Sequence, residues 1–148
     1  MEIVYAHAGM GRELIDAAVR AGAQGLVIAG VGDGNFGSVA LAAAAAAAQA
    51  GVVVVRSSRT GGGVVERNIE IDDDAAGFVA ADELNPQKAR VLLMLGLTRT
   101  RDPRVSNAEF RTKAKRCGVK NGHRIGKKRP RPAPNECSLR ISRSSPRR

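Results

Sequence analysis

A glycine-rich segment is the first candidate for binding chemistry in this chain. It spans residues 30–35, reads GVGDGN and follows an apolar run that is typical of a strand. Glycine lets a backbone approach a ligand closely, and Asp33 and Asn35 can offer polar contacts to it. The dinucleotide fingerprint requires G-x-G-x-x-G, and Asn35 stands where its last glycine belongs. The spacing therefore favours a tight strand-to-helix turn over nucleotide binding.

A second candidate is the RSSR segment at residues 56–59, which follows four consecutive valines. Its two arginines can form an anion site, or they can anchor a loop. Ser57 and Ser58 would need a histidine base to act as nucleophiles. The histidines of the chain are His7 and His123, and neither is close to the serines in sequence. A Ser-His hydrolase is thus poorly supported.

Acidic residues gather in a third place, at Glu66, Glu70, Asp72, Asp73 and Asp74. Carboxylates at this density can hold a cation. A solvated turn or the acidic first turn of a helix is the more common origin of such a run. The sequence therefore predicts no metal site and no cofactor.

Alternating strands and helices must position these residues. Apolar runs predict strands at 3–6, 25–30 and 52–55, helical periodicity predicts helices at 10–21 and 38–50, and residues 67–71 alternate weakly like a short edge strand. Asn85 and Pro86 then mark the beginning of a last helix. This order predicts an α/β domain, a small parallel sheet flanked by helices, with ligands beyond the carboxyl ends of the strands.

Charge divides the chain near residue 103. Its 148 residues carry 24 Lys and Arg against 14 Asp and Glu, a formal net charge of +10, and residues 104–148 hold 15 of the bases with two acids. This segment is rich in Arg, Pro and Ser and lacks apolar periodicity, so we expect a disordered basic tail after a 1–103 domain. Such a tail can bind nucleic acid or another polyanion. Its cysteines, Cys117 and Cys137, lack metal-site spacing.

Nothing in the sequence predicts membrane insertion or export. The longest apolar run, residues 39–48, is well below the roughly 18 residues needed to cross a bilayer. The first residues lack the basic region of a signal peptide.

Four blocks together resemble a known family. They are residues 29–35 (AGVGDGN), 54–59 (VVRSSR), 68–73 (NIEIDD) and 84–93 (LNPQKARVLL), in this order. The series is similar to the C-terminal domain of bacterial type II L-asparaginases, of the asparaginase/glutaminase family, over residues 1–103. This resemblance implies hydrolysis of the side-chain amide of L-asparagine, and less well of L-glutamine, to the acid and ammonia.

The resemblance implies a substrate-binding domain rather than a whole enzyme. Family members carry their nucleophilic threonine in a larger N-terminal domain, together with a second threonine, an aspartate and a lysine. No stretch here matches those motifs, and the TGGG at residues 60–63 lacks the final threonine of the nucleophile loop, so no catalytic residue is assigned. Asn35 and Glu70 match the two residues that reach into a neighbouring subunit's active site. There a carboxylate pairs with the substrate's α-ammonium group and an amide orients it. Asp33 departs from the family, which commonly has asparagine at this position.

The sequence therefore predicts a fragment of an L-asparaginase that is inactive alone. The implied partners are an N-terminal asparaginase domain and further copies in a homo-oligomer, usually a tetramer. The resemblance is compatible with either a periplasmic or a cytoplasmic location of the intact family member. Residues 104–148 share nothing with the family's ending and resemble a frameshifted, high-GC reading frame. The alternatives are polyanion binding through the tail and a free-standing small-molecule-binding domain.

Overall fold

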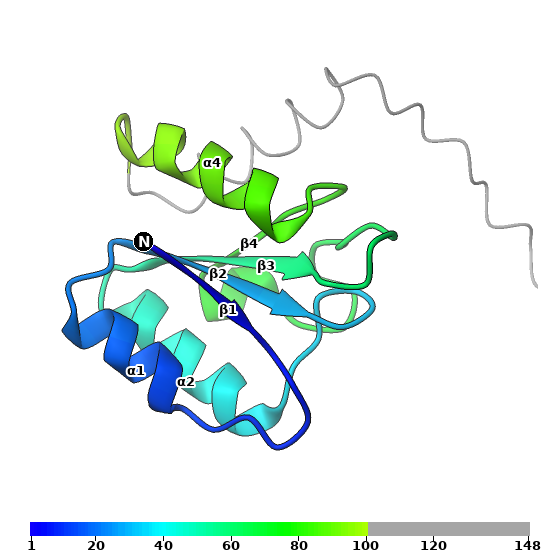
Figure 1. The fold of residues 1–148 in the computed structure, drawn as a ribbon, viewed down its shortest axis with the longest axis horizontal. Helices are drawn as coiled ribbons and strands as arrows, with labels where there is room; N and C mark the ends of the chain where they lie inside the picture. Colours follow the sequence, from blue (N-terminus) through cyan, green and yellow to red (C-terminus); the bar gives the residue numbers. More distant parts are fainter. Residues whose placement is uncertain (101–148) are drawn as a thin grey trace, which may run out of the picture.

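A four-stranded parallel sheet forms the centre of the molecule. The computed structural model describes residues 1–100, and its strands are β1 (Glu2–Tyr5), β2 (Gly25–Gly30), β3 (Val53–Ser58) and β4 (Phe78–Ala80). The strands lie side by side in chain order, and all of them are parallel. Their carboxyl ends therefore meet at one edge of the sheet, where the longer loops gather (Figure 1). The predicted α/β class with a small parallel sheet is confirmed.

The two central strands are buried along their whole length. All six residues of β2 and all six of β3 are buried. Each strand has a neighbour on both sides and helices over both faces, so no side chain of either strand reaches solvent. The register places Leu26 beside Val54 and Val27 beside Val55, a pairing of branched apolar side chains that suits a pleated sheet.

Helices cover both faces of the sheet. α1 (Glu13–Arg20) and α2 (Ser38–Gln49) lie on one face, and α4 (Pro86–Leu97) lies on the other (Figure 1). Leu26 belongs to the hydrophobic cluster under α1 and α2, and Val27 to the cluster under α4. Successive strand residues point to opposite faces, so one apolar run supplies both cores.

The alanine run lets α2 pack closely against the sheet. Its buried residues are Ala40, Ala43, Ala44 and Ala47, which lie on one face at helical spacing. Because these side chains are small, the helix backbone comes near the strands and α1. Alanine is also the best helix former, so the same residues specify both the helix and its packing.

The beginning of α4 is set by its cap. The side chain of Asn85 accepts a hydrogen bond from the backbone N–H of Lys88 at 2.9 Å, and Pro86 fills the first turn. Both assignments from the sequence are confirmed. Within residues 1–100, no helix is long and apolar enough to cross a bilayer.

The structure corrects two strand predictions. β3 does not end at Val55 but continues through Arg56, Ser57 and Ser58, which pair with β2. Residues 67–71 form a turn rather than an edge strand, and Asn68 has a left-handed φ of 58°. The edge position is taken by the three-residue β4, which follows the short helix α3 (Asp73–Ala76).

Candidate functional site

The glycine-rich segment forms a tight turn at the carboxyl end of β2. Val31 and Asn35 exchange two backbone hydrogen bonds of 2.9 and 2.8 Å, which close the turn. Gly34 has a φ of 76°, a conformation that suits glycine. A Cβ on Gly30 would lie 2.4 Å from the carbonyl carbon of Gly34, so a side chain does not fit there. The turn interpretation of this segment is confirmed, and it holds Asn35 just beyond the end of the strand.

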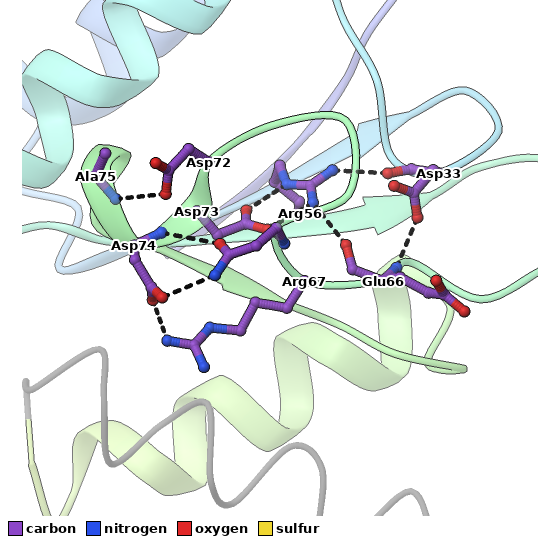
Figure 2. Close-up of polar contacts among 9 residues, drawn as sticks. Asp33, Arg56, Glu66, Arg67, Asp72, Asp73, Asp74 and Ala75 are labelled. Atoms are coloured by element: carbon purple, nitrogen blue, oxygen red, sulfur yellow. Dashed lines mark hydrogen bonds and ion pairs between the residues drawn. The ribbon is translucent and has the colours of Figure 1, made fainter.

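Arg56 is a buried cation beneath this turn, with no exposed side-chain surface. Its Nε and Nη2 donate to the two carboxylate oxygens of Asp73 at 2.5 and 2.8 Å (Figure 2). Nη1 donates to the backbone carbonyl of Asp33 at 2.7 Å, and Nη2 also donates to that of Glu66 at 3.1 Å. A planar guanidinium suits such a set of acceptors. The anchoring interpretation is confirmed for Arg56, whose donors are directed to the protein itself.

The acidic cluster is divided among structural tasks. Asp72 caps α3 by accepting from the N–H of Ala75 at 3.0 Å. Asp73 is buried against Arg56, and Asp74 pairs with the Arg67 guanidinium on the surface (Figure 2). The acidic first turn of a helix is thus the correct interpretation for these three aspartates. In the described part of the chain, no three His, Cys, Asp or Glu residues converge as they would around a metal ion.

Asn35 and Glu70 lie in contact although 35 residues separate them. The Nδ2 of Asn35 donates a hydrogen bond to Oε2 of Glu70. Asn35 is half-buried in the turn after β2, whereas Glu70 is exposed in the irregular segment between β3 and α3. The fold therefore brings together the two residues that the resemblance assigns to substrate contact.

Asp33 joins the two loops that carry this pair. Its Oδ1 accepts from the backbone N–H of Glu66 at 2.6 Å. Its Oδ2 is buried and has no hydrogen-bond partner in the structure. Only one of the two carboxylate oxygens of Asp33 therefore accepts a hydrogen bond. The asparagine that the family commonly has at this position would carry no negative charge.

The serines of β3 are engaged in structure. The Ser57 hydroxyl donates to the carbonyl of Leu84 at 2.8 Å, and the hydroxyls of Ser58 and Thr60 lie 2.8 Å apart. The Nδ1 of His7 lies 2.9 Å from the carbonyl oxygen of its neighbour Ala8. These contacts give each side chain a local role and lend no support to a Ser-His arrangement.

The sequence pointed to Arg56, Asn35 and Glu70, but it did not show that Asp73 is the partner of Arg56. A buried charge requires a buried counter-charge, but the valine run alone does not show that Arg56 is buried. The sequence does not identify which of several nearby acids supplies it. The predicted basic tail, with His123, Cys117 and Cys137, lies outside the described residues.

Much of the chain is similar in sequence to known proteins. Residues 1–110 match the family model described as the Glutaminase/Asparaginase C-terminal domain. The chain is 50% identical over 108 residues to a probable periplasmic L-asparaginase of Haemophilus influenzae, a match that covers 73% of this chain and 31% of that protein.

Further relatives match a similar share of this chain and of their own length. L-asparaginase 2 of Bacillus subtilis is 47% identical over 110 residues, which cover 74% of this chain and 29% of that protein. A glutaminase-asparaginase of Pseudomonas fluorescens is 39% identical over 103 residues, or 69% of this chain and 28% of that protein. The chain thus spans about 30% of the length of these curated relatives.

Proposed function

Because the chain belongs to the Glutaminase/Asparaginase C-terminal domain family, we propose that it supplies substrate contacts to an L-asparaginase. The reaction is hydrolysis of the side-chain amide of L-asparagine to L-aspartate and ammonia, with L-glutamine as a second substrate. In this proposal the chain binds and orients the amino acid, and an N-terminal asparaginase domain provides the threonine nucleophile.

The observation that carries the proposal is the pairing of Asn35 with Glu70 at the carboxyl edge of the sheet. Ligands of open α/β sheets bind at this edge. The hydrogen bond from Asn35 uses Oε2 of Glu70 and fixes the direction of the carboxylate. The other carboxylate oxygen can then accept a charge-assisted hydrogen bond from the α-ammonium group of the substrate.

The proposed partners include further copies of the chain. Val91, Met94 and Leu95 are about half exposed and lie on one side of α4 at i, i+3 and i+4 spacing. Apolar surface of this kind favours association in water. We therefore include a homo-oligomer in the proposal, with the outer side of α4 at one of its contacts.

Ammonia release from a chimera tests the proposed function. The full chain is joined to the N-terminal domain of the Haemophilus influenzae relative, whose C-terminal part is 50% identical to it. We expect the chimera to release ammonia from L-asparagine. Glu70→Gln should lower kcat/KM about 10- to 100-fold, mainly through KM, because a hydrogen bond to a charged group contributes roughly 1.5–3 kcal/mol.

Glu66→Gln is the matched control, because its side chain is exposed in the same segment and only its backbone contacts Arg56 and Asp33. It should leave kcat/KM within about twofold of the parent, since it changes no proposed substrate contact. An active chimera in which Glu70→Gln behaves like Glu66→Gln would refute the proposed role of Glu70.

A further inference from the structure

The two proposed substrate contacts stand on separate irregular segments. Asn35 lies in the turn that follows β2, and Glu70 lies between β3 and α3, outside any helix or strand. The two segments do not pair with each other as strands of the sheet. Two direct side-chain contacts join the segments, and both are exposed: the hydrogen bond from Asn35 to Glu70, and the one from the backbone N–H of Glu66 to Oδ1 of Asp33. A buried group that contacts both segments can fix the separation of these side chains more firmly than the exposed contacts do.

Arg56 contacts both segments from below. It donates to the carbonyl of Asp33, which is two residues before Asn35, and to the carbonyl of Glu66, which is four residues before Glu70. Its position is itself fixed, because it lies within β3 and is completely buried. The same guanidinium thus connects both loops to a central strand that is buried along its whole length.

Asp73 completes the connection on the Glu70 side. While its two oxygens accept from Arg56, Oδ2 also accepts from the backbone N–H of Asn68 at 3.0 Å. Asn68 is two residues before Glu70 and adopts a left-handed φ of 58°, so the chain turns sharply at this point. The carboxylate therefore stabilises the turn that directs Glu70 toward Asn35.

We infer that Arg56 and Asp73 are positioning residues for substrate recognition, which set the distance and orientation between Asn35 and Glu70. The inference rests on the proposed function of Asn35 and Glu70. It adds that Arg56 and Asp73 hold these two side chains in place without contacting the substrate. Arg56 is suited to it because one rigid fork binds a carboxylate and two carbonyls at once. Lysine carries the same charge but cannot reproduce this set of directions.

Nuclear magnetic resonance of the full chain tests the inference without any turnover assay. In the parent chain, Glu70→Gln removes the charged acceptor and should shift the side-chain amide signals of Asn35. In an Arg56→Lys background the same Glu70→Gln change should shift them at most a third as much, because the two side chains no longer meet. A folded Arg56→Lys variant with an undiminished response would overturn the inference.

The matched control is Arg67→Lys, which alters the Arg67–Asp74 ion pair in the same segment but neither of the carbonyl contacts of Arg56. Its Asn35 response to Glu70→Gln should equal that of the parent. An equal loss of response in Arg67→Lys would contradict a specific role for Arg56. If Arg56→Lys does not fold, Asp73→Asn takes its place, because it keeps the shape of the side chain, removes its charge and replaces one of the two acceptor oxygens by an N–H donor.

Hydrogen exchange in the parent chain is a second test of the inference, and it requires no substitution. The Nε–H of Arg56 and the backbone N–H of Asn68 both bond to Asp73, so one opening event should expose both. We expect their exchange rates to agree within about threefold and to be far slower than that of the exposed Gly62 amide. A freely exchanging Asn68 beside a protected Arg56 would overturn the coupling. Neither result depends on asparagine hydrolysis, so an inactive chimera and a failed positioning role are distinguishable.

Discussion

The carboxylate of Asp73 is the counter-charge of a guanidinium that has no access to solvent. We predict that Asp73→Ala lowers the free energy of unfolding by about 3–5 kcal/mol, because it leaves Arg56 buried and unpaired. Urea denaturation of the full chain measures this loss. Glu83→Ala, in the loop after β4, is the comparison and should change the same quantity by no more than about 0.5 kcal/mol. Equal effects of the two substitutions would show that the buried pair contributes little.

Asp16 provides a prediction about pH. The side chain of Arg12 donates a hydrogen bond to it at 2.5 Å and holds the pKa of the Asp16 carboxyl below its usual value. Because the folded pKa is lowered, the contribution to stability is present above the unfolded pKa and is lost as pH falls through the folded pKa. A carbon-detected titration of Asp16 should therefore show a low midpoint. Arg12→Gln should return it toward the ordinary aspartate value, and an unchanged midpoint would exclude Arg12 as the cause.

Helix α4 shows how one residue defines an element. Asn85→Ala removes the acceptor for the Lys88 N–H and should lower the free energy of unfolding by about 1 kcal/mol. Asn85→Asp retains an acceptor and should stay close to the parent. Thermal unfolding at fixed pH compares the three proteins. A loss of equal size in both variants would mean that the amide group, rather than capping, is what matters.

Most elements of the fold could be predicted because local signals agreed with burial. The glycine-bounded run that became β2, the alanines of α2 and the Asn85 cap each carried a pattern that tertiary structure reinforced. The edge strand could not be predicted, because Phe78–Ala80 is three residues long and shows no period of its own. The alternation at residues 67–71 was misleading, since Asn68 turns the chain there.

The candidate site was harder to predict from the sequence, because its contacts join residues that are far apart along the chain. Arg56 resembled the end of a strand because a charge normally marks exposure, yet a partner 17 residues later keeps it inside β3. Asn35 and Glu70 were identified through the family resemblance rather than through their spacing. Their contact is a property of the sheet topology, which brings the ends of β2 and β3 together.

At the scale of the whole molecule, the half-exposed apolar residues of α4 predict self-association. Replacing Val91 and Leu95 together by lysine adds two charges to that side of the helix. We expect the dissociation constant of self-association to rise at least about tenfold, since burying two such side chains contributes several kcal/mol. Sedimentation velocity over a concentration series measures it. Gln49→Lys, on the exposed side of α2, is the control, and a similar shift in both proteins would exclude α4 from the contact.

In the proposed function, this domain holds the amino-acid end of the substrate. The most direct measurement is a crystal structure of the chimera with L-aspartate, the reaction product, bound. We predict that the α-ammonium nitrogen lies about 3 Å from a carboxylate oxygen of Glu70, with the Asn35 side chain against the ligand. A well-ordered product whose ammonium group contacts neither Asn35 nor Glu70 would contradict the account.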